Sequence, residues 1–255
     1  MENKDNRNHF NKRGKKASGS KRGKMSRDIV LVIDFEATCW NHKTPEGMHN
    51  EIIEIGISGV DYVTKEVVLR DTIIVKPEFS EVSSFCTSLT TITQEFLDEN
   101  GVSFAEACEI LETKYKSKDR IWMSWGEYDK NIIASNCELK GIKNPFGRTH
   151  INMMPLFSFA FGIKKDLGVA QALEHLGMEF EGTAHRGGDD AYNIAKILKK
   201  TFVPLMTNSK YGEEEDIGDG EVSYKKNIEY VDKMYKKVDL HNNVARIINK
   251  TTPSK

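Results

Sequence analysis

The sequence predicts an α/β or α+β sheet domain of roughly 175 residues, because strand patterns come first and strand and helix patterns then alternate. A continuous apolar, β-branched run over residues 29–33 is typical of a central strand that is buried on both faces. Two further strand patterns cover residues 51–62 and 66–77, and the second closes at Pro77. With 38% hydrophobic and 29% charged residues, a chain of 255 residues suits one globular domain with tails.

The second half of the domain is expected to be mainly helical, with a short strand over residues 120–125. Helices are expected over residues 90–117 (broken at Gly101), 127–141, 151–162 and 166–180, and from near Asp190.

The two ends of the chain differ in composition from the domain, which we assign to residues 28–203. Residues 1–27 hold ten Lys and Arg against Glu2 and Asp5, which predicts a disordered basic arm with a net charge of +8. Since the whole chain carries −1, the rest carries −9, and a basic arm on an acidic body suits contact with a polyanion. A solvated tail that only aids solubility is the alternative. Residues 204–255 read as an acidic linker and a C-terminal helix, whose apolar stripe would pack on the domain or bind a partner.

The cellular location is also constrained by the sequence. No apolar run approaches the ~20 residues needed to cross a bilayer, and the N-terminus lacks the apolar segment of a secretory signal. The four cysteines are scattered without a C-x-x-C pair, which argues against a zinc site and fits reduced thiols. These features indicate a cytoplasmic protein.

Two acids continue the first strand on one of its faces. Because side chains alternate along a strand, Val30, Val32, Asp34 and Glu36 share a face. Two like charges in a partly dry place repel each other unless a cation compensates for them, and Mg²⁺ or Mn²⁺ prefers carboxylate oxygens. The alternative is that the strand reaches solvent at Asp34.

Asp129 repeats this pattern on the helix expected over residues 127–141. Ile132, Ile133 and Leu139 form its apolar stripe, and Asp129 precedes the two isoleucines by three and four residues, so it falls on the buried face. The alternative is an acid that is only stabilised by the dipole of the helix in its first turn.

The stretch "HRGGDD", residues 185–190, opens the last helix of the domain. At about 100° per residue, Asp190 lies roughly 40° and Asp189 roughly 140° from the apolar Ile194. Asp190 therefore faces inward, whereas Asp189 points outward or caps the helix. The Gly-Gly pair is expected to let the loop turn tightly and to bring His185 beside Asp190.

Four inward-facing acids and a histidine suit one chemistry. Four carboxylates match what two divalent cations, about 3.5–4 Å apart, need for in-line attack on a phosphodiester. A histidine is then a suitable general base for water, because imidazole titrates near neutral pH. The residues are Asp34, Glu36, Asp129, His185 and Asp190.

These residues also resemble the motifs of the DEDDh 3′-to-5′ exonucleases. The D-x-E motif matches "DFEATCW", the Asp that opens a helix matches "SWGEYDKNI", and H-x-x-x-x-D matches "HRGGDD", where the spacing selects Asp190. Over residues 28–203 the sequence is most similar to the ERI-1-like branch, which includes histone-mRNA 3′-exonucleases. The resemblance implies an RNase H-like α/β fold, a mixed β-sheet flanked by helices. It also implies two Mg²⁺ or Mn²⁺ ions and release of nucleoside 5′-monophosphates from RNA 3′ ends, with single-stranded DNA as a further substrate.

The resemblance also implies a role for each residue. Asp34, Glu36, Asp129 and Asp190 would be metal ligands, and Glu36 and His185 would be catalytic. The residues implied to bind the terminal nucleotide are Ala37, Thr38 and Tyr128, the last as a stacking platform with core packing as its alternative.

Two other functions are compatible with these residues. One is a DNA-proofreading type of 3′-to-5′ exonuclease, and the other is a nucleic-acid-binding module that has kept the fold without the activity. None of the motif positions is degraded, which favours an enzyme.

Overall fold

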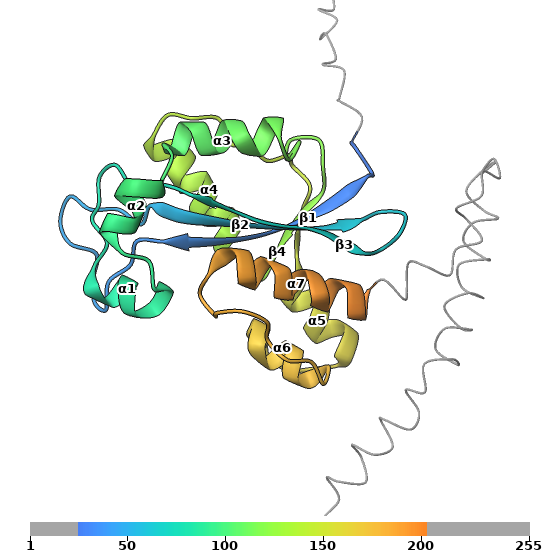
Figure 1. The fold of residues 1–255 in the computed structure, drawn as a ribbon. Coiled ribbons are helices and arrows are strands. Elements are labelled where there is room, and N and C mark those ends of the chain that lie inside the picture. The colour runs from blue at the N-terminus through green and yellow to red at the C-terminus, as the bar shows by residue number, and fades with distance from the viewer. Residues whose placement is uncertain (1–24, 203–255) are drawn as a thin grey trace, which may run out of the picture.

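The computed structural model of the protein describes residues 25–202 (Figure 1). The arm predicted over residues 1–27 lies outside this range except for its last three residues. The linker and helix predicted over residues 204–255 lie wholly outside it.

A five-stranded mixed sheet forms the centre of the domain, in the order β3-β2-β1-β4-β5. The central strand β1 pairs antiparallel with β2 and parallel with β4, β2 pairs antiparallel with β3, and β4 pairs parallel with β5. The mixed sheet predicted from the sequence is confirmed. The strands are β1 Ile29–Ala37, β2 Ile52–Asp61, β3 Val67–Ile74, β4 Trp122–Ser124 and β5 His150–Asn152.

The helices cover both faces of this sheet. In Figure 1, α3 and α4 lie over one face, α5, α6 and α7 lie over the other, and α1 and α2 lie at the end of the sheet where β1 stops. The helices are α1 Ser84–Thr90, α2 Gln94–Asn100, α3 Phe104–Thr113, α4 Tyr128–Leu139, α5 Met153–Phe161, α6 Val169–His175 and α7 Gly187–Thr201.

Three elements differ from the sequence prediction. Helix α1 was not expected; Ser83 caps it by accepting the N–H of Cys86. Strand β5 was also missed, because a three-residue strand is too short to show periodicity and the helical pattern of α5 follows at once. Helix α6 is shorter than the expected 166–180, since Gly177 has φ 66° just after its end.

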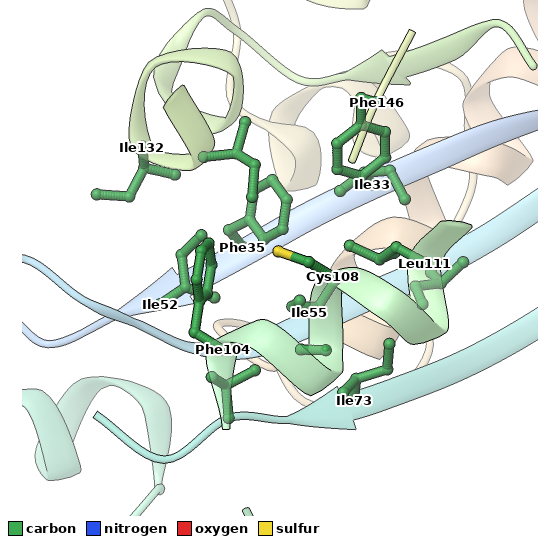
Figure 2. Packing of buried hydrophobic residues seen from close by; sticks show 14 of the residues in the cluster. Ile33, Phe35, Ile52, Ile55, Ile73, Phe104, Cys108, Leu111, Ile132 and Phe146 are labelled. Carbon is green, nitrogen blue, oxygen red and sulfur yellow. The ribbon is translucent and has the colours of Figure 1, made fainter. Parts of the chain in front are cut away.

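The core lies on both faces of β1, as predicted from its apolar run. On one face, Ile33 and Phe35 of β1 pack against Phe104 and Leu111 of α3 (Figure 2). On the other face, Val30 and Val32 of β1 pack against α7 residues. Burial of such a side chain contributes about 1.5–3 kcal/mol, so β1 is firmly anchored on both faces.

Helix α7 lies unusually close to the backbone of β2. A Cβ atom at Gly56 would lie 1.8 Å from the carbonyl oxygen of Gly187, and one at Gly188 would lie 2.2 Å from Oγ1 of Thr72. The glycines therefore serve the packing of the first turn of α7 on the sheet. This corrects the expectation that the Gly-Gly pair serves a tight turn, since Gly187 and Gly188 both lie within the helix.

Two further findings concern membrane-spanning helices and cysteines. Between residues 25 and 202, no helix has the length and apolar character to cross a membrane. All four cysteines belong to this range and are free thiols.

Candidate active site

Three of the predicted acids meet between β1 and α7. Asp34 and Glu36 extend the β1 face on which Val30 and Val32 contact α7, and Asp190 lies in the first turn of that helix. Their ligand oxygens all lie within 4.8 Å of one another, and all three residues are partly buried. The inward orientation that helical rotation predicted for Asp190 is therefore seen.

The electrostatics of this cluster are unfavourable without a cation. Burial, followed by the charges of Asp129, Asp190 and Glu36, raises the pKa of Asp34 well above its ordinary value. Burial, followed by the charge of Asp190, raises the pKa of Glu36 to about 8. Burial raises the pKa of Asp190 to about 6, although the charge of His185 opposes the shift. The cluster thus holds protons near neutral pH that a cation would displace.

Asp129 lies outside the three grouped acids, on the helix that follows β4. It lies in the first turn of α4, is 3% exposed, and its Oδ1 accepts a hydrogen bond of 2.9 Å from the N–H of Phe35. Burial raises the pKa of Asp129 to about 7, even though the bond from Phe35 lowers it. Asp129 is therefore tied to β1 at the residue between Asp34 and Glu36.

One member of the stripe predicted for α4 is wrong. Ile132 and Ile133 are buried, but Leu139 is 36% exposed. Asn136 is buried instead, where its Oδ1 accepts the N–H of Ile52 and its Nδ2 donates to the carbonyl of Asn50. The buried face of α4 therefore includes a polar amide that holds the start of β2. Hydrophobic periodicity cannot detect a buried polar residue of this kind.

His185 lies in the loop immediately before α7. Its side chain is exposed, and its φ of 61° is in the left-handed region that non-glycine residues seldom adopt. His185 precedes Asp190 by five positions at the entrance to α7, and contact of its imidazole with the acid cluster stays a prediction.

Of the two alternatives that the sequence left for Asp189, pointing outward or capping α7, the cap is not seen. Rather than capping α7, its carboxylate accepts the N–H of Thr183 at 2.8 Å and pairs with Arg70 at 2.5 Å. Burial alone would raise the pKa of Asp189, but these two partners hold it below its ordinary value. Asp189 thus fastens the loop that carries His185 to β3.

The residues expected to bind a terminal nucleotide differ in exposure. Tyr128 is 54% exposed, so core packing is not its role. Ala37 is 5% exposed and Thr38 is fully buried, where its hydroxyl donates to the carbonyl of His49 and accepts the N–H of Glu51. Contact of Ala37 and Thr38 with a nucleotide stays a prediction.

Sequence reasoning missed two charged residues beside the cluster. Glu54 of β2 is 1% exposed and lies opposite Glu36 in the register of the two strands. Its carboxylate pairs with Arg186 at 2.8 Å and accepts the N–H of Gly187 at 2.7 Å. An acid inside the apolar "EIIEIG" was the available signal, but its partner lies 132 positions away.

The donor set fits a hard divalent cation. Clustered carboxylate oxygens are the ligands that Mg²⁺ and Mn²⁺ prefer, and a cation would relieve the mutual repulsion that helps to raise the pKa values of these acids. Asp34, Glu36 and Asp190 would be the inner ligands, with Asp129 beside them.

Comparison with known proteins identifies relatives. The RNase T exonuclease family model matches residues 31–198. The probable 3′-5′ exonuclease KapD of Bacillus subtilis is 31% identical over 177 residues, which cover 69% of this chain and 85% of KapD. Human 3′-5′ exoribonuclease 1 is 31% identical over 182 residues, covering 67% of this chain but only 51% of the human protein, so this chain spans about half of that relative.

A solved structure extends the similarity to three dimensions. The nuclease domain of 3′hExo, a DEDDh family member bound to rAMP, superposes with a TM-score of 0.62 at 30% identity. The match covers 71% of this chain and 94% of that domain. The RNase H-like fold predicted from the sequence is confirmed.

Proposed function

The chain belongs to the RNase T exonuclease family, and we propose that it is a 3′-to-5′ exonuclease that shortens RNA and releases nucleoside 5′-monophosphates. The observation that carries the proposal is the meeting of Asp34, Glu36 and Asp190, with ligand oxygens within 4.8 Å of one another. The names of several relatives, among them human 3′-5′ exoribonuclease 1, favour RNA as the substrate.

In the proposed mechanism, the acids hold and orient divalent ions at the 3′ end of the substrate. Asp34, Glu36 and Asp190 would hold the ions through their grouped oxygens, and Asp129, oriented by its bond from Phe35, would assist them. When bound, two such ions supply positive charge for the phosphate and lower the pKa of water. The partial burial of the acids keeps these interactions strong, because solvent screens them less.

His185 is the proposed general base. In the proposed mechanism its exposed imidazole reaches the water held near Asp190 and accepts a proton from it at a ring nitrogen. The loop bonds made by Asp189 to Thr183 and Arg70 hold the backbone from which His185 projects.

Substrate binding is proposed for the residues around the ends of β1 and α4. The exposed ring of Tyr128 gives a face on which a base can stack without regard to sequence. Ala37 and Thr38 shape the backbone next to Glu36, since the Thr38 hydroxyl links this segment to His49 and Glu51.

The basic residues 1–27 are proposed to contact phosphates further along the strand. Their net charge of +8 suits contact with a polyanion such as the phosphate backbone of RNA. Deletion of residues 1–24 should weaken RNA binding and flatten its salt dependence while turnover at saturating RNA stays nearly intact. An unchanged salt slope would rule out this contact.

Polarity and substrate can be tested with one set of oligonucleotides. The purified protein with Mn²⁺ should shorten a 5′-labelled RNA stepwise and release labelled mononucleotide at once from a 3′-labelled one. A DNA oligonucleotide of the same sequence measures how much the 2′-hydroxyl contributes. Release of mononucleotide first from the 5′ end, or none from RNA, would contradict the proposal.

A further inference from the structure

The buried acid Glu54 is saturated by donors from the start of α7. Its Oε1 accepts Nη2 of Arg186 at 2.8 Å, both oxygens lie 3.2 Å from Nε of Arg186, and Oε2 accepts the N–H of Gly187 at 2.7 Å. Across the strand pair it faces Glu36, so it borders the acid cluster without being one of the three grouped acids. Both of its oxygens therefore bind donors at the start of α7 and do not face a cation site.

Arg186 connects this acid to both functional residues of the motif. Its N–H donates to Oδ2 of Asp190 at 3.2 Å, and its carbonyl accepts the N–H groups of Asp189 and Asp190 at 2.8 and 2.9 Å. On its other side it follows His185, whose φ of 61° has to be held by its surroundings. A change in the direction of Arg186 would therefore move His185 and Asp190 together.

The geometry of the Arg186–Glu54 contact indicates that Arg186 orients the start of α7 and does more than balance negative charge. A guanidinium that reaches a carboxylate through Nε and Nη2 fixes the plane of the group, whereas an ammonium is a point charge. The Arg186 side chain is 31% exposed and that of Glu54 is 1% exposed, so the pair is anchored at its buried end.

On the basis of the proposed function, we propose that Arg186, held by Glu54, is a positioning residue for the reaction. It fixes His185 and Asp190 relative to Asp34 and Glu36 before any substrate arrives. Glu54 acts through Arg186 and is not an ion ligand.

The variant R186K separates positioning from charge. Lysine keeps the positive charge but cannot make the two-nitrogen contact of the guanidinium with Glu54. If Arg186 only offsets the acids, R186K should match wild type, and R186M should bind Mn²⁺ more tightly because a competing cation is gone. If Arg186 positions the site, both variants should bind Mn²⁺ about 10- to 100-fold more weakly and lose kcat by a similar factor, with less change in KM. E54Q should show the same losses.

The matched control is R120K. Arg120 makes a similar fork with Asp28, through Nε at 2.9 Å and Nη2 at 2.5 Å, just before β1 begins and far along that strand from Glu36. R120K should leave kcat and Mn²⁺ affinity as in wild type.

Calorimetric Mn²⁺ titration and amide hydrogen exchange test the proposal without an activity assay. We expect faster exchange over residues 182–190 in R186K, unchanged exchange in β1, and no further loss when E54Q is added to R186K, because the two residues act as a unit. Wild-type Mn²⁺ affinity and exchange in R186K would overturn the proposal. If R186K does not fold, E54D, which keeps the charge and shortens the reach, gives the same readouts. A wild-type protein that leaves RNA intact would refute the proposed function alone, since these two measurements still decide the role of Arg186.

Discussion

Oδ1 of Asp129 accepts a hydrogen bond of 2.9 Å from the N–H of Phe35, a residue 94 positions earlier in the chain. Phe35 is the residue between Asp34 and Glu36, and its own side chain packs on the opposite face from theirs. The bond therefore aligns an acid of α4 with the two acids of β1 through the strand backbone. The geometry of the site depends on the core that holds β1 and α4 together.

The metal-free protein should lose stability as the pH rises from about 6 to 8. Carboxyl groups in unfolded chains titrate near pH ~4, whereas the native pKa of Glu36 is about 8 and that of Asp129 about 7. In this window the native state binds more protons than the unfolded state, so the free energy of unfolding falls with pH. Thermal unfolding without divalent ions measures the fall, and the rise in Tm on adding Mn²⁺ should be larger at pH 8 than at pH 6.

The variant E36Q is the control for this pH effect, because it removes the carboxyl group whose pKa is raised to about 8. Its Tm should decline less between pH 6 and 8. A metal-free Tm that rises with pH equally in wild type and E36Q would contradict the electrostatics described for the cluster.

Gly56→Ala should displace α7 from the sheet. The added methyl group would lie 1.8 Å from the carbonyl oxygen of Gly187, and backbone atoms cannot move aside as a flexible side chain can. Overpacking of this kind destabilises by about 1–3 kcal/mol or more, and activity should fall because α7 carries Asp190. Urea unfolding and the RNA assay measure both effects.

Gly168→Ala is the matched control, since its Cβ would meet no heavy atom within 4 Å in the described part of the chain and its φ is −69°. Because Gly168 is the N-cap of α6, where alanine is less favourable than glycine, the variant's free energy of unfolding should fall by no more than about 1 kcal/mol. Equal effects of the two substitutions would show that the close approach of α7 to β2 is not required.

Lys140→Met should destabilise the fold by about 3 kcal/mol, because removal of one partner leaves a buried charge uncompensated. The Lys140 and Glu51 side chains are 4% and 0% exposed, and they pair at 2.6 Å. Glu51 also accepts the N–H groups of Glu78 and Phe79, which hold the segment next to the start of β2. Chemical unfolding measures the loss.

Lys130→Met provides the comparison for this ion pair. Lys130 pairs with Glu127 one helical turn away, with both side chains about half exposed, so the expected loss is about 0–1 kcal/mol. Similar losses in the two variants would contradict the assignment of Glu51–Lys140 as a buried anchor.

The positions of the motif acids could be predicted from the sequence because they follow local periodicity. Strand alternation placed Asp34 and Glu36 together, and helical rotation separated Asp190 from Asp189; both statements concern a few neighbouring residues. The family motif H-x-x-x-x-D selected the same Asp190, so two independent arguments agreed on it.

The support around these acids could not be predicted in the same way. The Glu54–Arg186 pair spans 132 positions, and the polar Asn136 replaces Leu139 on the buried side of α4. The glycines of "HRGGDD" were assigned to a turn because only the packing of α7 on Gly56 reveals their steric role. Each of these depends on contacts between distant elements, which periodicity along the chain does not contain.

The neighbouring acids Asp189 and Asp190 give the most direct test of the account. In a Mn²⁺-dependent assay with 5′-labelled RNA, Asp190→Asn should reduce turnover below detection, because it removes one of three grouped ligand carboxylates. Asp189→Asn should reduce turnover by less than about tenfold, since its amide oxygen can still accept the N–H of Thr183. Full activity of Asp190→Asn, or loss of activity in Asp189→Asn alone, would contradict the proposed site.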